Sequence, residues 1–280
     1  MTHKKAGMTH KHMKLFAKKS LGQHFLNSPT ALKQIISAAE IRNDETVLEI
    51  GPGTGILTAE LLKTGAKVIA VEKDDRAISL LEQTFANEFK SGQLTLIHGD
   101  ILELDMASIG LANDSYKLVA NIPYYITGAI LERFLEHEPR PKKIVLLVQK
   151  EVAERIIARD GKESILSISV KAFGMPKIIA TVPRGAFTPA PNVDSAILAI
   201  AGIAAESFKE IGIDIRGFFS IVRAGFAHKR KLLKRNLEAV CEMGKIEEAW
   251  KALGLDEKAR AEDLKPSDWI SISKELHIRA

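Results

Sequence analysis

Cysteine and long apolar runs are nearly absent from this 280-residue chain. The single cysteine, Cys241, excludes an intrachain disulfide and a thiolate metal cluster. No run of eighteen or more residues is continuously apolar, which argues against a membrane-spanning helix. The N-terminus is basic but lacks the apolar stretch and cleavage site of a secretory signal, so we expect a cytoplasmic protein.

The net charge of +5 is modest, but the basic residues are unevenly placed. Lysines and histidines crowd the first nineteen residues, and a second basic cluster spans residues 223–235. This placement makes an acidic partner such as nucleic acid plausible. We expect residues 1–20 to form a flexible basic tail, and we assign no metal site to its His3, His10 and His12.

Apolar strands alternate with helical segments through the first half of the chain. We expect strands at residues 46–50, 67–71, 94–97, 118–120 and 144–148. Ser28-Pro29 is a typical helix start, and residues 74–89 read as one helix. Continuous apolar strands that alternate with helices predict an α/β fold, with a mostly parallel sheet covered on both faces.

The pattern changes after Lys150. A helical region runs to Phe173, and two strand-like runs at residues 177–182 and 196–200 can pair as a hairpin. The small, featureless residues 201–205 then precede a helical, turn-rich segment. We therefore predict a flexible tail at residues 1–20, a catalytic domain at 21–202 and a small all-α domain at 203–280.

A glycine-rich turn follows the first of these strands. Gly51, Gly53 and Gly55 lead into a helix, an arrangement that lets the backbone approach a ligand. A dinucleotide-binding turn needs a small residue where Ile56 stands, which weakens an NAD interpretation. S-adenosylmethionine, which has no pyrophosphate, suits the turn better, with Gly51 and Gly53 against its amino-acid tail and sugar.

Carboxylates follow the next two strands. Glu72 ends the strand at 67–71, where it can accept hydrogen bonds from ribose hydroxyls. Asp100 follows the strand at 94–97, where it can accept from the adenine amino group of the cofactor. A lone carboxylate at a strand end is usually a helix cap or solvated, but two at successive ends favour a cofactor site.

The tetrapeptide Asn121-Ile122-Pro123-Tyr124 follows the fourth strand, at the same edge of the sheet. The N6 lone pair of adenine is delocalised into the ring, so this amine is a poor nucleophile. The Asn121 side-chain oxygen and the Ile122 carbonyl can accept its two N–H groups and favour a pyramidal nitrogen. Pro123 fixes the backbone, and Tyr124 offers a face on which an extruded base stacks.

Five motifs in order make the chain similar to the ribosomal RNA adenine N6,N6-dimethyltransferases, most closely the bacterial small-subunit branch. The resemblance runs from about Lys18 to Leu276. The motifs are Leu21-Gly22-Gln23-His24-Phe25-Leu26, Glu49-Ile50-Gly51-Pro52-Gly53-Thr54-Gly55, Asn121-Ile122-Pro123-Tyr124, Leu147-Val148-Gln149-Lys150-Glu151-Val152 and Phe187-Thr188-Pro189-Ala190-Pro191-Asn192-Val193-Asp194-Ser195.

The resemblance implies a fold and an activity. The fold is a Rossmann-like class I methyltransferase with a seven-stranded, mostly parallel sheet, one antiparallel strand and a small all-α C-terminal domain. His24, where the family more often has asparagine, and Leu26 are then expected to line the cofactor beside Asn121, with Phe187 opposite Tyr124. The implied reaction methylates N6 of two adjacent adenines in the 3′-terminal hairpin of small-subunit rRNA, within the 30S subunit or its precursor.

We predict that the C-terminal basic cluster is a helix that docks on RNA. An enzyme acting on one hairpin of a large RNA needs phosphate contacts beyond its base pocket, and no acidic residue interrupts this cluster. Phe218, Phe219 and Phe226 are expected to be buried on the opposite side. The predicted RNA-binding residues are Arg223, Lys229, Arg230, Lys231, Lys234 and Arg235.

Other functions remain open from the sequence. Large-subunit methyltransferases that confer macrolide resistance share the cofactor and base motifs, although Val193-Asp194-Ser195 favours the small-subunit branch. A mitochondrial transcription factor of this fold should carry an Arg-rich leader, yet no arginine precedes Arg42. A ribosome assembly factor, whose binding matters more than catalysis, is a further class. Protein amide methyltransferases use a related motif, but Ile122 counts against them.

Overall fold

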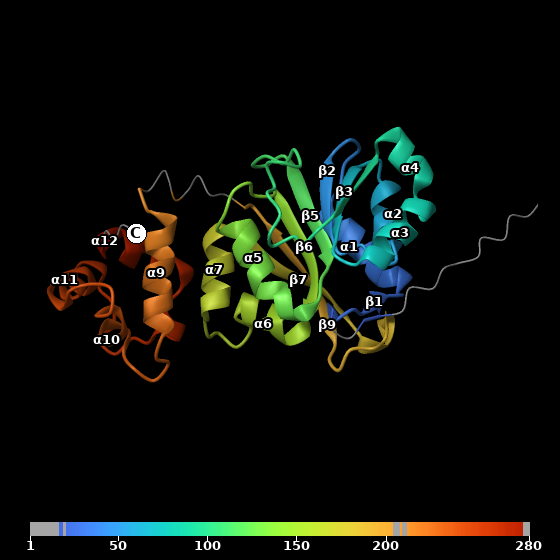
Figure 1. The fold of residues 1–280 in the computed structure, drawn as a ribbon. Coiled ribbons are helices and arrows are strands. Elements are labelled where there is room, and N and C mark those ends of the chain that lie inside the picture. The colour runs from blue at the N-terminus through green and yellow to red at the C-terminus, as the bar shows by residue number, and fades with distance from the viewer. Residues whose placement is uncertain (1–16, 19–20, 204–207, 209–211, 277–280) are drawn as a thin grey trace, which may run out of the picture.

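The computed structural model describes residues 17–18, 21–203, 208 and 212–276, so most of the predicted tail lies outside the described residues. A seven-stranded sheet with the strand order β4-β3-β2-β5-β6-β9-β7 forms the centre (Figure 1). Its strands are β2 (Thr46–Ile50), β3 (Lys67–Glu72), β4 (Leu94–His98), β5 (Tyr116–Asn121), β6 (Lys143–Gln149), β7 (Met175–Val182) and β9 (Ser195–Ala201).

Strand β9 runs against both of its neighbours. It pairs antiparallel with β6 and β7, whereas β2 to β6 pair in parallel. The predicted hairpin between residues 177–182 and 196–200 is therefore confirmed. The predicted α/β sheet with one antiparallel strand is confirmed as well, within the described part of the chain.

Each face of the sheet carries its own apolar cluster, because alternate side chains of a strand point to opposite faces. In β2, Val47 packs into one cluster and Leu48 into the other. The Val47 face is covered by α1 (Pro29–Ala39), α2 (Ile56–Leu62), α3 (Asp75–Thr84) and α4 (Ala86–Ser91). The Leu48 face is covered by α5 (Thr127–Leu135), α6 (Lys150–Ile157) and α7 (Ile165–Phe173).

Helix α1 begins where the sequence predicts. The Ser28 hydroxyl accepts a hydrogen bond from the Ala31 amide at 3.2 Å, and Pro29 occupies the first turn. Leu32 and Ile35 are buried on its inner side. The cap and the apolar spacing together therefore place this helix against the sheet.

The single helix predicted at residues 74–89 is wrong. Two helices, α3 and α4, meet at Phe85, whose backbone leaves the helical region with φ −113° and ψ 32°. The ring of Phe85 is buried and lies against Gly55 of the glycine turn, where an added Cβ would come within 2.6 Å of it. The helix is therefore interrupted at the residue whose ring packs against the glycine turn.

A separate two-stranded sheet joins the N-terminal segment to the loop before β9. Strand β1 (Phe25–Leu26) pairs antiparallel with β8 (Phe187–Thr188), which places Leu26 opposite Phe187. The Asn27 side-chain amide donates to the Thr188 hydroxyl at 2.5 Å. The segment before α1 is therefore held near the carboxyl edge of the main sheet.

The chain ends in a helical region beside α7 (Figure 1). Trp250 and Trp269 are buried there, as expected, and Phe173 of α7 packs against Phe208 and Phe219 with ring centroids 5.1 and 5.8 Å away. One apolar cluster therefore continues from the sheet into this region. The helices of this region that the structure describes in full are α9 (Ile215–Phe226), α10 (Leu233–Leu237), α11 (Met243–Leu253) and α12 (Pro266–Leu276).

Within the described residues, no helix combines the length and apolar character needed to cross a membrane. The described residues also include the short 3-10 helices η2 (Tyr124–Ile126), η3 (Arg184–Ala186) and η4 (Ala261–Asp263).

Candidate active site

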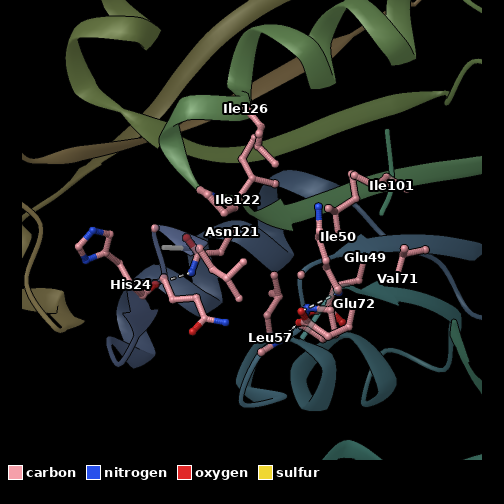
Figure 2. Close-up of a pocket in the computed structure, with 18 of the residues that line it drawn as sticks. His24, Glu49, Ile50, Leu57, Val71, Glu72, Ile101, Asn121, Ile122 and Ile126 are labelled. Carbon is pink, nitrogen blue, oxygen red and sulfur yellow. Dashed lines mark hydrogen bonds between the residues drawn. The ribbon is translucent and has the colours of Figure 1, made fainter. Parts of the chain in front are cut away.

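A cavity of about 270 Å³ opens at the carboxyl edge of the parallel strands. Figure 2 shows Glu49 and Glu72 on one side of it and Asn121 and His24 on the other. Phe187 does not line it. The predicted site residues that do line it are His24, Leu26, Gly51, Gly53, Glu72, Asp100, Asn121, Ile122, Pro123 and Tyr124.

The glycine turn forms one wall of the cavity. Gly51 adopts φ +65°, and an added Cβ there would meet nothing within 4 Å, so open space lies beside it. Gly53 adopts φ +55°, and a Cβ there would stand 3.0 Å from the Phe25 ring. Both positions therefore require the left-handed backbone that glycine adopts without strain, and Gly51 leaves room for a ligand.

Glu72 is buried at the end of β3 and organises the surrounding backbone. One of its oxygens accepts the amides of Lys73 and Asp74, each at 2.8 Å, and the other accepts the Gly53 amide at 3.0 Å. Burial raises the pKa of this carboxyl above its usual value. A carboxylate has about four acceptor positions, so one remains on Oε2 for a ligand hydroxyl.

Glu49, in β2, is the most unusual group that lines the cavity. Its side chain is 1% exposed, and neither of its carboxylate oxygens has a hydrogen-bond partner among the described residues. Burial, with the nearby charge of Glu72, raises the pKa of Glu49 to about 8. A buried, unpaired carboxyl is costly, so this position fits a site that receives a cationic group.

Asp100 lies near the cavity but already has two protein partners. Its Oδ2 accepts from the Lys73 ammonium at 2.6 Å, and its Oδ1 accepts from the Leu102 amide at 3.0 Å. The Lys73 hydrogen bond and the Leu102 amide lower the pKa of Asp100. Each oxygen can accept one more hydrogen bond, so Asp100 can still accept from an adenine amino group as predicted.

Asn121 ends β5 with its side-chain amide fixed. Its Nδ2 donates to the His24 carbonyl at 3.1 Å, which leaves Oδ1 as an acceptor. The neighbouring Ile122 is buried, and its carbonyl accepts no hydrogen bond from the described residues. Two acceptors on adjacent residues are therefore available at the predicted base site.

Tyr124 is held from behind. Its hydroxyl lies 2.7 Å from the hydroxyl of Ser195, and burial raises the pKa of the phenol. The His24 ring stacks nearby, with centroids 5.8 Å apart and an interplanar angle of 19°. Among the described residues, His24 stacks beside Tyr124, whereas Phe187 pairs with Leu26 and is buried in the apolar core. The role of Phe187 at the base stays a prediction.

These features agree with the comparison to known sequences. The family model described as ribosomal RNA adenine dimethylase matches residues 15–277. The chain belongs to the ribosomal RNA adenine dimethylase family. Relatives named ribosomal RNA small subunit methyltransferase A include one from Dehalococcoides mccartyi (strain ATCC BAA-2100), 43% identical over 93% of this chain and 89% of its own. Another, from Lactiplantibacillus plantarum, is 38% identical over 94% and 91%.

The fold of this dimethylase-family chain is also similar to solved structures. A dimethyladenosine transferase from Plasmodium falciparum superposes with a TM-score of 0.74 at 30% identity, over 89% of this chain and 96% of that one. The 23S rRNA methyltransferase ErmE superposes with a TM-score of 0.69 over 91% and 100%. At 24% identity, ErmE supports the fold alone.

The basic cluster of this dimethylase-family chain is not one helix, contrary to the prediction. Arg223 lies in α9, which ends at Phe226, and Lys234 and Arg235 lie in α10. Residues 227–232 between them form an exposed loop, and Leu233 after it is buried in the core. Phe218 and Phe219 are buried as expected, whereas Phe226 is partly exposed.

The cations of the cluster differ in their partners. Lys234 pairs with Glu257, Arg235 pairs with Glu238 at 2.7 Å, and Arg223 lies over the Phe219 ring at 5.9 Å. Among the described residues, the loop cations form no ion pair. These loop cations are Lys229, Arg230 and Lys231.

Several site residues escaped the sequence analysis. Glu49 carries a readable signal, since it is a charged residue within an apolar strand. Gln23 donates to the buried Asp74 at 3.0 Å, and Ser195 holds Tyr124, but both contacts join segments far apart in the chain. Tyr125 also lines the cavity, next to the predicted site residue Tyr124.

No group of three or more His, Cys, Asp or Glu side chains that could hold a metal occurs among the described residues. His3, His10 and His12 lie outside them. Cys241 is partly buried and unpaired with another cysteine.

Proposed function

We propose that this chain transfers methyl groups from S-adenosylmethionine to N6 of adenine in small-subunit rRNA and forms N6,N6-dimethyladenosine. The targets proposed are the two adjacent adenines of the 3′-terminal hairpin, within the 30S subunit or its precursor in the cytoplasm. The observation that carries the proposal is Asn121, whose amide nitrogen is tied to His24 so that its oxygen remains an acceptor. The names of the relatives at 38–43% identity support the substrate class.

The cavity fits S-adenosylmethionine, a cofactor that supplies an activated methyl group and carries an ammonium and a sulfonium. The Glu49 carboxyl is protonated when no cation is bound, and a bound cation favours its ionisation to a counter-charge. Gly51 offers open space beside the backbone, and Glu72 keeps one acceptor position for a ribose hydroxyl. We therefore propose that Glu49, Gly51, Gly53 and Glu72 hold the cofactor, with His24, Leu26 and Asp100 at its edges.

The protein's part in the transfer is to orient the amine. Asn121 Oδ1 and the Ile122 carbonyl accept the two N–H groups, which favours a nitrogen lone pair directed at the methyl donor. Pro123, with φ −57°, fixes the turn, and Tyr124 gives a face for the extruded adenine. No strong base is needed in the protein, because methylation acidifies the amine and water can take the released proton.

Docking on the particle falls to the C-terminal region in this proposal. Lys229, Arg230 and Lys231 form an exposed loop without ion pairs among the described residues, so their charge is available to phosphates. Arg223, Lys234 and Arg235 already contact protein groups and contribute less. Phe187 is retained as a support for the base pocket through its pairing with Leu26.

The test is mass spectrometry of rRNA from a deletion strain complemented with the wild type or Asn121→Ala. The wild type should restore dimethyladenosine in small-subunit rRNA, and Asn121→Ala should not. Methylation that appears in large-subunit rRNA instead would overturn the substrate assignment. If Asn121→Ala restores subunit assembly without methylation, binding by an assembly factor is the more important role.

A further inference from the structure

Two consecutive tyrosines stand at the base site in opposite environments. Tyr124 is half-buried and bound to Ser195, whereas Tyr125 is 70% exposed. Both belong to the turn η2, and both line the same cavity. A large aromatic ring left in water at the mouth of an active site has an apolar face ready for a ligand.

The ring of Tyr125 packs on the N-terminal segment at this mouth. It lies on Gly22, where an added Cβ would come within 3.2 Å of its Cε1 atom and 3.5 Å of Pro123. Gly22 adopts φ +59°, so another residue there would be strained and would also push the ring away. One side of the exposed ring therefore lies against the N-terminal segment.

A lysine lines the same cavity as Tyr125. This residue, Lys73, has a side chain that is 63% exposed. Lys73 is anchored by Asp100 at 2.6 Å. An exposed aromatic face is the kind of platform on which the bases of single-stranded nucleic acid stack.

We propose that Tyr125 is a stacking platform for the nucleotide that adjoins the target adenine in the RNA strand. The proposal rests on the function proposed above. Extrusion of one base removes the stacking partner of its neighbour, and a ring at the pocket mouth replaces that partner. Because the proposed targets are adjacent, the base on Tyr125 is the second adenine, held near the pocket while the first is methylated.

Cofactor covering is the competing role for this ring. The groups proposed to hold the cofactor lie deeper, since Glu49 and Glu72 are buried, whereas Tyr125 lies at the exposed rim. If the Tyr125 ring stacks on RNA, its removal leaves the affinity for the cofactor unchanged. If the ring covers the cofactor, its removal weakens that affinity.

The experiment measures methylation of unmodified small-subunit particles by the full chain. Tyr125→Ala and Tyr125→Leu should raise KM for the particle by roughly fivefold to a hundredfold, as for loss of one stacked base. Tyr125→Phe and Tyr125→Trp should keep the low KM, because they retain an aromatic face. Met175→Ala is the matched control, since Met175 is 69% exposed but lies outside the cavity.

Two further measurements separate the outcomes. Calorimetry with S-adenosylmethionine should give equal affinities for wild type and Tyr125→Ala, and a weaker affinity in the variant would overturn the platform. A hairpin RNA with 2-aminopurine on either side of the target adenine should be quenched by wild type and less by Tyr125→Leu. Equal KM and quenching in all variants also overturn it, whereas a wild type that methylates no small-subunit particle refutes the proposed function itself.

Discussion

The hydroxyls of Tyr124 and Ser195 lie 2.7 Å apart and join the turn after β5 to the first residue of the antiparallel strand β9. Ser195 is fully buried, so its hydroxyl has a fixed direction. The contact fixes the position of the Tyr124 hydroxyl oxygen and so restrains the ring from swinging away from β9. In the proposed reaction, this fixes the face on which the adenine stacks.

Ser195→Ala is expected to lower the single-turnover methylation rate by up to about tenfold, the value of one hydrogen bond. Tyr124→Phe removes the same bond from the other side and should have a similar effect. The double variant should be no slower than either single variant, because both lose one shared contact. Additive losses would mean that Ser195 acts on something other than Tyr124.

Asn121→Ala should lower the single-turnover rate by about a hundredfold or more, since one preorganised polar group is lost. This side chain also donates to the His24 carbonyl, so the alanine variant loses two interactions. Asn121→Asp separates them, because it keeps an acceptor but cannot donate. If Asn121→Asp methylates faster than Asn121→Ala, and both variants bind the cofactor as the wild type does, the loss of rate in the alanine variant comes from the lost acceptor.

Glu49 predicts a pH-dependent stability. In the unfolded chain its pKa is near 4.5, and in the folded protein burial raises the pKa to about 8. Between these values the unfolded state is ionised while the folded state stays protonated. Stability should therefore fall as pH rises through this window, by up to about 1.4 kcal/mol for each pH unit.

Denaturant titrations of the wild type and Glu49→Gln between pH 5 and 8.5 check this. The variant should lose the part of the decline that comes from Glu49, while Glu136, whose pKa burial raises to about 7, still contributes in the same range. Glu60→Gln is the control, since Glu60 is a surface residue of α2 paired with Lys63 at 2.6 Å. The Glu49→Gln protein should also bind S-adenosylmethionine more weakly, because it offers no counter-charge.

The basic loop predicts a graded salt dependence for binding to small-subunit particles. Lys231→Ala should reduce the slope of log K against log salt by about one, because its charge has no partner among the described residues. Lys234→Ala should change it less, because Glu257 already pairs with this lysine. Equal slopes for wild type and Lys231→Ala would make the loop an ordinary solvated surface.

The sequence predicts best where the structure is local. The strand at residues 46–50 is found with those bounds, and Glu72 and Asn121 end their strands while Asp100 follows its strand. Since parallel strands end at one edge, these side chains line one cavity. The order of elements in the chain was therefore enough to bring them together.

What the sequence did not predict depends on contacts between distant segments. Pairing of β1 with β8 turns Phe187 into the core and leaves His24 beside Tyr124. Helix α3 ends early where Phe85 packs on Gly55, thirty residues away, and the basic cluster opens into a loop between α9 and α10. Neither local propensity nor charge spacing carries information about such partners.

The apolar cluster that continues from Phe173 into α9 has a consequence for cooperativity. The rings of Phe208 and Phe219 are covered by a residue of the catalytic half, so neither part buries its surface alone. Unfolding of the helical region exposes Phe173 and weakens the packing behind the sheet. Heating should therefore give one calorimetric transition rather than two, and the basic loop keeps a fixed distance from the base pocket until the whole chain unfolds.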